Sequence, residues 1–388
     1  MLVITDINTL WRRKPFEALG RLMPVLGARP RDLLCAWRER HMAALGAEGG
    51  MVECAVTLPF GWASRTADVS QRWLWRSLTK AVRRTGLQPR ALVVTSPHYL
   101  ALARQLAGLV PIYYYASDDY RSYEGWGRAG TGVLERAVVE LAEHSFFVSR
   151  ALAERAIREY HLVPHRVSVS MNGTEPRFIA APAHIAPLPE VAAHFARPVA
   201  GVVGGVNARL DWRLLRRVAA MQEIGTLLFV GGVDPRMEDD PDFCAVRNHE
   251  KSRFVGYRPH GELPGWMQGL DVALIPYRQS EMNYYCSPMR LFDHLASGRP
   301  IVATSACAQV SEFKEWVDTG EDDEDFLERL ARRLTGGNSG VDACQVQVAR
   351  EHLWARRAAG LAGRLGTGLL DAAVIQEKQV DDRQGNCR

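Results

Sequence analysis

The stretch SPMRLFDHLASGRPIVAT, residues 287–304, holds the signals for a short helix followed directly by a strand. Four residues mark the limits of the helix: Ser287 as a cap, Pro288 in the first turn, Gly298 at the end and Pro300 after it. The apolar residues 301–304 are typical of a buried strand. The stretch therefore predicts a helix over 288–297 that leads through a tight turn into a strand, one step of an alternating α/β fold.

The same alternation extends over the C-terminal half of the chain. Short apolar strands are expected at 199–203, 226–230, 253–257 and 271–277, with helices after Asp211, around 263–270 and over 321–334. Strands that are apolar throughout are typical of a parallel sheet covered by helices on both faces. The N-terminal half repeats the pattern less clearly, with strand candidates at 2–5, 91–95, 111–116, 145–149 and 166–170.

A linker is expected between the two halves. Residues 174–198 show little periodicity and contain prolines at 176, 182, 187 and 189. We therefore predict an α/β protein with two Rossmann-like domains, residues 1–185 and 186–342, whose parallel sheets face each other across a cleft. A helix within residues 343–370 would return to the N-terminal domain, and residues 371–388 would form a loose polar tail.

Composition and charge exclude several classes of protein. The 388 residues are 47% hydrophobic and 24% charged, as in a globular protein with a full core. No apolar run reaches the ~18 residues of a membrane helix, and the start MLVITDINTLWRRK lacks the order of a signal peptide. The seven cysteines include no Cys-x-x-Cys pair, and a net charge of +4 is too small to indicate nucleic-acid binding. We expect a reduced, cytoplasmic, two-domain enzyme.

In open parallel sheets, ligands bind beyond the carboxyl ends of the strands, and two glycines stand at such an end. Gly204 and Gly205 follow the strand at 199–203, where the lack of side chains lets a phosphate or a sugar approach the backbone. A tight turn without a ligand is an equal alternative. Because the Gly-x-Gly-x-x-Gly pattern is absent, NAD or FAD is not expected.

The start of the 288–297 helix is a candidate anion site, since the amides there carry about half a positive charge. Arg290 and Asp293 lie three residues apart and hence on one face of this helix. The guanidinium could bind a diphosphate while the carboxylate holds two ribose hydroxyls. The alternative is a surface ion pair between these two side chains.

Three titratable residues follow strands of the N-terminal half. Asp118 and Asp119 come after the strand at 111–116, where burial raises a carboxyl pKa and suits general-base chemistry on a hydroxyl. The alternative is that one of them caps the next helix. His98 ends the neighbouring strand and is the other candidate base, although a lone histidine is more often structural. Residues 170–173, Ser-Met-Asn-Gly, indicate only a turn.

The sequence gives little sign of a metal site. His161 and His165 have helical spacing, but Pro164 interrupts the helix that would align them. Asp240-Pro-Asp242 resembles the metal-binding Asp-x-Asp of certain transferases, yet it lies in an acidic loop well past its strand, which favours a solvated loop. We expect no metal and no cofactor.

Taken in order, several segments between about residues 90 and 305 resemble bacterial glycosyltransferases of the GT-B fold, in particular family-4-like enzymes of the teichuronic-acid type. In the first domain the resemblance rests on YYASDDY at 114–120, AEHSFFVS at 142–149 and VSMNG at 169–173. In the second domain it rests on GVVGGVNARLD at 201–211, FVGY at 254–257, DVALIPY at 271–277 and, most specifically, residues 288–304.

The resemblance implies that the C-terminal domain binds a nucleotide-sugar donor and that the N-terminal domain binds the acceptor. Carried over to this chain, the donor-binding residues are Gly204, Gly205, Arg209, Tyr257, Ser287, Met289, Arg290 and Asp293. Tyr257 would line the base pocket, and the two arginines would face the diphosphate without a metal. Asp293 stands where these enzymes usually carry the glutamate that holds ribose, and Tyr285 replaces a second glutamate eight residues earlier.

For the acceptor, the resemblance implies a hydroxyl group of a polysaccharide, a lipid-linked sugar or a small molecule. Asp118, Asp119 or His98 would then accept the proton of this hydroxyl or orient it. Enzymes of this family typically retain the anomeric configuration, in which case no dedicated base is required. Two other functions stay open: a nucleotide-sugar epimerase or hydrolase on the same scaffold, and a non-catalytic partner of another transferase.

Such transferases often act at the inner face of the cytoplasmic membrane, and two segments fit peripheral membrane contact. Trp11–Lys14 is basic and aromatic, and Val69–Arg84 places tryptophans and leucines among five basic residues. For the second segment, a core-facing helix with a solvated basic face is an equal alternative.

Overall fold

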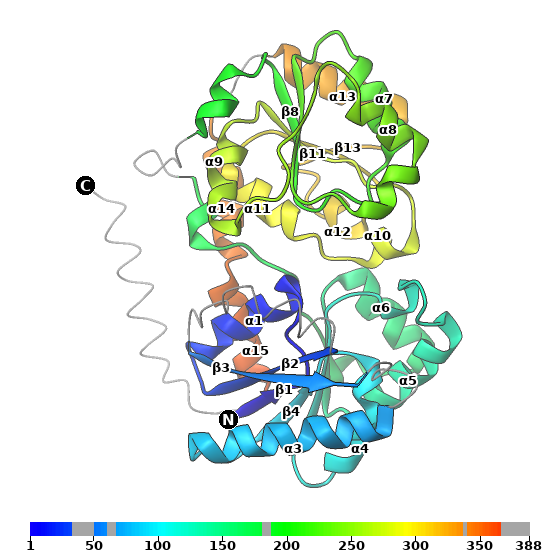
Figure 1. The fold of residues 1–388 in the computed structure, drawn as a ribbon, viewed down its shortest axis with the longest axis vertical. Coiled ribbons are helices and arrows are strands. Elements are labelled where there is room, and N and C mark those ends of the chain that lie inside the picture. The colour runs from blue at the N-terminus through cyan, green and yellow to red at the C-terminus, as the bar shows by residue number, and fades with distance from the viewer. Residues whose placement is uncertain (33–49, 60–66, 181–187, 337–339, 366–388) are drawn as a thin grey trace, which may run out of the picture.

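The computed structural model describes residues 1–32, 50–59, 67–180, 188–336 and 340–365. Two parallel sheets, each with its own hydrophobic core, divide the chain into an N-terminal and a C-terminal lobe (Figure 1). The predicted α/β class with two Rossmann-like domains is confirmed. The predicted domain boundary at residue 185 and the predicted tail at 371–388 lie outside the described residues.

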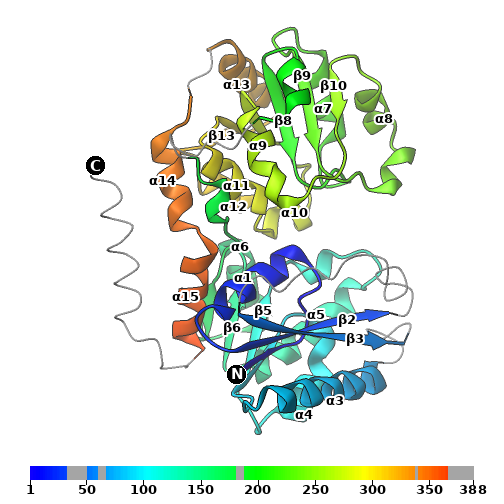
Figure 2. The same cartoon turned by 60° about the vertical axis from the view of Figure 1, so that its left-hand side comes forward.

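The N-terminal sheet has the strand order β3-β2-β1-β4-β5-β6-β7, and all neighbouring strands are parallel. Its strands are β1 (Leu2–Ile4), β2 (Val25–Asp32), β3 (Met51–Leu58), β4 (Ala91–Val94), β5 (Ile112–Ala116), β6 (His144–Phe147) and β7 (Val167–Val169). The helices of this lobe are α1 (Leu10–Gly20), α3 (Ala67–Thr85), α4 (Leu100–Leu106), α5 (Arg128–Leu141) and α6 (Arg150–Tyr160). Figure 2 shows α3 and α4 on one face of the sheet and α1 on the other.

The C-terminal sheet has the order β10-β9-β8-β11-β12-β13, again with parallel neighbours, which is the order of the nucleotide-binding Rossmann fold. Its strands are β8 (Val199–Val203), β9 (Thr226–Val230), β10 (Ser252–Phe254), β11 (Val272–Ile275), β12 (Ile301–Thr304) and β13 (Asp318–Gly320). The helices are α7 (Trp212–Ala220), α8 (Pro241–Arg247), α9 (Leu263–Gln268), α10 (Glu281–Tyr285), α11 (Met289–Ser297), α12 (Ala308–Ser311) and α13 (Asp323–Thr335).

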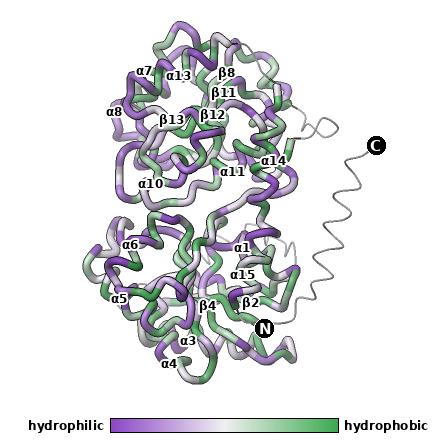
Figure 3. The backbone as a smooth tube through the Cα atoms, turned by 180° about the vertical axis from the view of Figure 1, so that it is seen from behind, coloured by the Kyte–Doolittle hydropathy of each residue, from purple (hydrophilic) through white to green (hydrophobic). Residues whose placement is uncertain are grey.

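Hydrophobic burial explains why the strands are apolar along their whole length. Every residue of β8, β9 and β11 is buried, because helices cover both faces of the sheet. Figure 3 shows the hydrophobic segments gathered inside each lobe and hydrophilic segments around the outside. The apolar pattern from which parallel strands were predicted therefore arises because both faces of these strands are buried.

Two helices at the end of the described chain join the lobes. α14 (Ala343–Glu351) packs against α11, and α15 (Trp354–Arg364) packs against α1 in the N-terminal lobe. Trp354, Ala358 and Leu361 of α15 are buried in the N-terminal core. The chain thus returns to the lobe in which it started, and this return is visible along one side of the molecule in Figure 2.

The sequence pattern missed β2 and β3, and β2 shows why. β1 pairs only with Val25–Gly27 of β2, whereas β3 pairs with β2 along its full length. Pro30 therefore lies in a part of β2 that has a neighbouring strand on one side only. A proline, which has no N–H group to donate, is tolerated there because no strand on the other side needs that hydrogen bond. A proline within a short polar run resembles a loop in sequence.

The stretch 287–304 folds as predicted except at its first residue. α11 ends at Gly298, whose φ of 65° is the left-handed conformation that glycine adopts readily, and β12 follows. The N-cap position is occupied by Pro288, and no side chain caps the helix. The prediction that Ser287 caps this helix is therefore wrong, because its hydroxyl is used in a contact with the other lobe.

The turns after β8 and β9 contact each other through their backbones. The Gly204 amide donates to the Val230 carbonyl at 2.8 Å. A Cβ atom on Gly231 would lie 2.0 Å from the Gly204 carbonyl oxygen, whereas a Cβ on Gly232 would meet nothing within 4 Å. Gly231 therefore allows the two turns to approach at the edge of the sheet where a ligand is expected.

We predict that Gly231→Ala destabilises the protein by about 2 kcal/mol or more, because the new methyl group displaces the Gly204 turn. Chemical denaturation measures this effect. The matched control is Gly232→Ala, which we expect to stay close to the wild-type stability. Equal stabilities of the two variants would contradict the close approach.

Candidate functional site at the interdomain junction

Two arginines lie beside one buried aromatic ring at the carboxyl ends of the C-terminal strands. The Cζ atoms of Arg209 and Arg290 lie 5.4 Å and 5.2 Å from the centre of the Tyr277 ring. Arg209 follows β8, Tyr277 follows β11, and Arg290 is in the first turn of α11. The structure therefore brings together two residues that the sequence assigned to a diphosphate site.

Each of these guanidinium groups has a buried nitrogen that finds no hydrogen-bond partner among the residues that the structure describes. These atoms are Nη2 of Arg209 and Nη1 of Arg290. A buried donor without an acceptor costs free energy, and two neighbouring cations also repel each other. An anion placed against both groups would relieve both penalties, which makes this pair a candidate anion site.

Gly204 and Gly205 lie against Arg290, one of the two arginines. Nη2 of Arg290 donates to the Gly205 carbonyl at 3.1 Å, and a Cβ on Gly204 would lie 3.1 Å from the same nitrogen. Gly204 has a φ of 115°, which a residue with a side chain rarely adopts. A glycine at position 204 is thus favoured both by the turn and by the close approach of Arg290.

Arg209 is fixed by Asn283, a residue that the sequence analysis did not identify. Nε of Arg209 donates to Oδ1 of Asn283 at 2.8 Å, and Nδ2 of the Asn283 side chain donates to the backbone carbonyl of Arg209 at 2.9 Å. Asn283 is completely buried in α10. Asn283 and Tyr277 carry no sequence signal of their own, since an asparagine in a loop-like segment and a tyrosine after a strand are both common.

Asp118 follows β5 and lies within electrostatic reach of Arg209 of the other lobe. Burial raises the pKa of Asp118 above its ordinary value, and the Arg209 charge and a bond from the Tyr123 hydroxyl partly offset this effect. The Tyr123 hydroxyl donates to Oδ2 of Asp118 at 3.0 Å. A carboxyl group with a raised pKa next to the anion site fits the predicted proton acceptor.

Asp119 has a structural role, as the capping alternative proposed. Burial alone would raise its pKa, but two bonds from Arg155, at 2.6 and 3.0 Å, and a bond from Ser122 outweigh burial and lower the pKa. Its carboxylate also caps the short helix that follows, through the Arg121 amide. With its oxygens engaged in this way, Asp119 is not a candidate proton acceptor.

His98 is half-buried, and its ring packs edge-on against Trp126 with the ring centres 4.2 Å apart. Burial lowers the pKa of His98, so the imidazole is neutral at physiological pH. Its Nδ1 atom is buried and has no hydrogen-bond partner. His98 thus belongs to an aromatic cluster beside Asp118, and a role as a base stays a prediction.

Three of the predicted donor-binding residues face the N-terminal lobe instead. Oγ of Ser287 accepts a bond from the Asn172 amide at 2.9 Å, and Met289 packs against the N-terminal core. Asp293 accepts a bond from the Thr174 hydroxyl at 2.7 Å. The prediction that Arg290 and Asp293 serve one ligand from one helix face is not supported, because Arg290 turns towards Gly205 and Asp293 towards the lobe junction.

The other two sequence positions of interest differ in exposure. Tyr257, which follows β10, is 75% exposed, so its ring is accessible, and its place in a base pocket stays a prediction. Tyr285 replaces the expected glutamate, and the centre of its ring lies 4.1 Å from Cζ of Arg155. The backbone carbonyl of Tyr285 accepts a hydrogen bond from the Ser149 hydroxyl, so Tyr285 links α10 to the N-terminal lobe.

The acidic pattern that resembled a metal site has other partners. Asp240 caps α8, and Asp242 pairs with Arg216 at 2.8 Å. Within the residues that the structure describes, no three His, Cys, Asp or Glu side chains are grouped for a metal ion.

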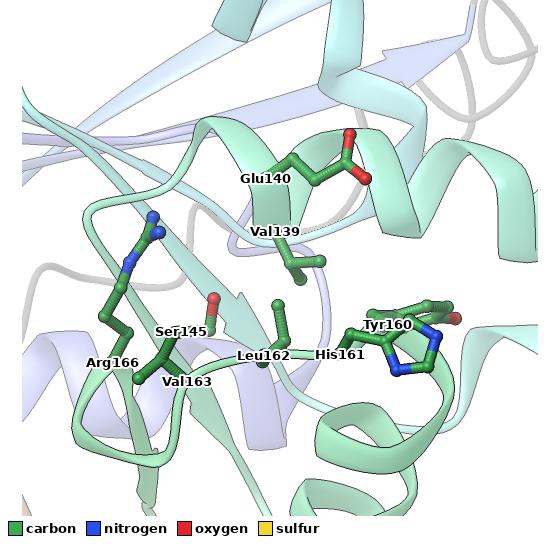
Figure 4. Close-up of a pocket in the computed structure, with 8 residues that line it drawn as sticks. All are labelled: Val139, Glu140, Ser145, Tyr160, His161, Leu162, Val163 and Arg166. Carbon is green, nitrogen blue, oxygen red and sulfur yellow. The ribbon is translucent and has the colours of Figure 1, made fainter.

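His161 lines a pocket of about 160 Å³ between α5 and the segment after α6 (Figure 4). This pocket is at the amino ends of β6 and β7 and is remote from the ligand-binding edge of the sheet.

The segment Trp11–Lys14 does not form a membrane-facing surface. Arg12 pairs with Asp6 at 2.6 Å, Arg13 pairs with Glu17 and Glu53, and Lys14 pairs with Glu17 and Glu175. These basic side chains are at most 15% exposed, because α1 packs between the sheet and α15. The predicted contact at Trp11–Lys14 is therefore wrong.

For α3, the sequence left open either membrane contact or a core-facing helix, and the structure shows a different face of the helix suited to each. Leu74, Leu78 and Val82 are buried in the core, as the core-facing alternative required. Val69 and Trp73 are each 57% exposed, and Arg76, Lys80 and Arg83 are exposed on the same stripe of the helix. In the part of the chain that the structure covers, no helix has the length and hydrophobicity needed to cross a membrane.

We predict that Asp293 makes the stability of the protein depend on pH. Its pKa rises from 3.8 to about 7, mainly because the carboxyl group is buried; the bond from Thr174 and the charge of His260 oppose this rise, and the charge of Glu175 adds to it. The folded protein therefore binds a proton that the unfolded chain releases, so the free energy of unfolding falls as pH rises from 3.8 to about 7 and then levels off. Denaturation of wild type and Asp293→Asn at several pH values should show this fall in the wild type alone; parallel profiles would contradict it.

Comparisons with known proteins agree with this geometry. Residues 197–335 match a family model described as glycosyl transferases group 1. The putative teichuronic acid biosynthesis glycosyltransferase TuaH of Bacillus subtilis (strain 168) is 26% identical over 160 residues. This match covers 40% of the present chain and 40% of that relative, so the chain spans less than half of the relative's length in the alignment.

Solved structures are similar over nearly the whole chain. HepE from Anabaena, in complex with UDP and glucose, has a TM-score of 0.68 at 14% identity and covers 94% of this chain and 99% of its own. Sucrose-phosphate synthase from Thermosynechococcus elongatus has a TM-score of 0.66 at 15% identity, with 95% and 98% covered. At such identities the similarity shows the fold. The chain therefore has the GT-B fold that the sequence resemblance implied, and residues 197–335 of its C-terminal lobe are similar to the glycosyl transferases group 1.

Proposed function

We propose that the protein is a glycosyltransferase that moves a sugar from a nucleotide-sugar donor to a hydroxyl group of an acceptor. The observation that carries this proposal is the pair of guanidinium groups at Tyr277, each with a buried, unpartnered nitrogen. The similarity to HepE, which was solved with UDP and glucose, supports UDP as the nucleotide. The family match of residues 197–335 supports the transfer of a sugar.

The chemistry follows from the charges that develop during the reaction. When the anomeric bond breaks, negative charge grows on the diphosphate and positive charge grows on the sugar. Arg209, Arg290, the amides of the first turn of α11 and the Gly204–Gly205 turn are positioned before the reaction, so they stabilise the leaving diphosphate without reorganisation. This arrangement supports a reaction in which protein cations, and no metal ion, hold the diphosphate.

Asp118 is the candidate for the acceptor side of the reaction. Its carboxyl group lies near Arg209, and burial raises its pKa towards the range in which a carboxylate accepts a proton at neutral pH. In a mechanism that retains the anomeric configuration, the same carboxylate would orient the hydroxyl by a hydrogen bond.

We predict that Arg290→Ala lowers turnover of the UDP-sugar by ~10²-fold or more, the usual effect of losing one preorganised donor. The matched control is Arg333→Ala, which removes an exposed guanidinium that pairs with Asp318 away from the site. Steady-state kinetics should show no loss for the control. Unchanged kinetics of Arg290→Ala would exclude this residue from the diphosphate site.

Two measurements test the class of activity. A thermal-shift screen over nucleoside diphosphates should show stabilisation by UDP, since a ligand that binds only the folded state raises its melting temperature. Release of UDP that depends on an added acceptor identifies a transferase. Donor conversion without acceptor would instead indicate an epimerase or a hydrolase, and absence of UDP binding would favour a non-catalytic scaffold.

We also propose that the exposed face of α3 contacts the anionic surface of the cytoplasmic membrane, where a lipid-linked acceptor would be presented. Trp73 and Val69 supply apolar contact, and Arg76, Lys80 and Arg83 supply positive charge along the same stripe. α3 runs along the end of the N-terminal lobe that is remote from the C-terminal lobe (Figure 1). Contact through this face would leave the interdomain junction unobstructed.

Charge reversal of Arg76, Lys80 and Arg83 to glutamate should weaken binding to vesicles that contain phosphatidylserine by at least about tenfold, since each basic residue contributes ~1 kcal/mol near such a surface. Vesicle sedimentation measures the binding. Reversal of Arg216, Arg247 and Arg253 on the C-terminal lobe changes the net charge equally and serves as the control. Failure of the wild-type protein to bind these vesicles would remove the proposal.

A further inference from the structure

A cluster of aromatic rings lies beside Asp118 on the N-terminal side of the junction. The centre of the Trp126 ring is 4.2 Å from that of His98, 5.0 Å from that of Tyr123 and 5.8 Å from that of Tyr120. Tyr120 is completely buried, whereas the other three rings are half-buried. The cluster therefore consists of one core ring that supports three rings with accessible surface.

Polar groups occur at the edge of this cluster. The Tyr123 hydroxyl donates to Asp118 at 3.0 Å, and Nδ1 of His98 is buried without a hydrogen-bond partner. The half-buried indole ring of Trp126, with the His98 and Tyr123 rings set edge-on to it and the Asp118 carboxyl group bonded to Tyr123, matches the chemistry of a sugar ring. One face of a pyranose carries mainly C–H groups, and its rim carries hydroxyls that donate and accept hydrogen bonds.

The loop that carries Trp126 also reaches the C-terminal lobe. Glu124 pairs with Arg236 at 2.9 Å, and Arg128 pairs with Glu281 at 2.5 Å. Both pairs are exposed, so they contribute little stability. They nevertheless show that residues 124–128 lie against the lobe that holds Arg209 and Arg290. A ligand on the aromatic cluster would therefore lie near the boundary between the two lobes.

We propose that His98, Tyr123 and Trp126 form the acceptor subsite, and that it binds the acceptor as a pyranose ring packed on the Trp126 side chain with one hydroxyl directed to Asp118. This inference rests on the proposed function and specifies the substrate class on the acceptor side. Trp126 determines which ring face is bound, Tyr123 orients the Asp118 carboxylate, and the His98 imidazole fixes the Trp126 ring through their edge-on contact.

The test uses the full chain and a panel of methyl α- and β-glycosides of glucose, galactose, mannose and N-acetylglucosamine. Saturation-transfer NMR, with and without saturating UDP, should show contact at the C–H protons of at least one glycoside. Trp126→Ala should weaken that binding by about tenfold, the equivalent of ~1.4 kcal/mol, and Trp126→Phe should retain part of it. Leu109→Ala, which removes a 76% exposed apolar side chain before the amino end of β5, is the control and should bind like the wild type.

The outcomes separate this inference from the proposed function. Calorimetry with UDP should give the same affinity for wild type and Trp126→Ala; an equal loss of UDP binding would assign the loop to the donor site and overturn the acceptor subsite. No contact with any glycoside, or contact that persists in Trp126→Ala, would also overturn it. If the wild type binds a glycoside but not UDP, the donor proposal fails while the sugar subsite stands.

Discussion

Two like charges held beside one buried ring set the main constraint on this structure. Arg209 and Arg290 come from different strand-to-helix connections and meet at Tyr277, where each keeps an unpartnered nitrogen. The repulsion between them and the unsatisfied donors have to be offset by the rest of the fold. Asn283, the Gly205 carbonyl and the Tyr277 ring provide that support, and an anionic ligand would provide the remainder.

The neighbouring carboxylates Asp118 and Asp119 show how local partners decide chemical roles. Both are buried, yet the pKa of Asp118 is raised and that of Asp119 is lowered. The difference arises from Arg155, which holds Asp119 in a two-bond ion pair while Asp118 has only the Tyr123 hydroxyl and a backbone amide as hydrogen-bond partners. Asp119 therefore stabilises the loop, and Asp118 stays available for a substrate hydroxyl.

α11 connects the two functions of the fold. Its Arg290 side faces the glycine turns of the C-terminal lobe, whereas Ser287, Met289 and Asp293 contact the N-terminal lobe. The helix that supplies a cation to the anion site is thus also part of the junction between lobes. Any movement of one lobe against the other would change the contacts at the first turn of α11, where the diphosphate is proposed to bind.

The sequence alone determined the α/β class, the parallel sheets and the limits of the segment 288–304, because burial on both faces and helix-ending residues leave local patterns. Local patterns also singled out Gly204, Gly205 and Arg290, and the family resemblance singled out Arg209; the structure places all four at one edge of the C-terminal sheet. Only the tertiary structure decided that Asp293 and Ser287 face the other lobe, that Asp119 is held by Arg155 and that Trp11–Lys14 is ion-paired. The partner is 36 residues away for Asp119 and 115 or more for Ser287 and Asp293, and no local pattern records such contacts. Trp11–Lys14 has both nearby partners, such as Glu17, and distant ones, Glu53 and Glu175.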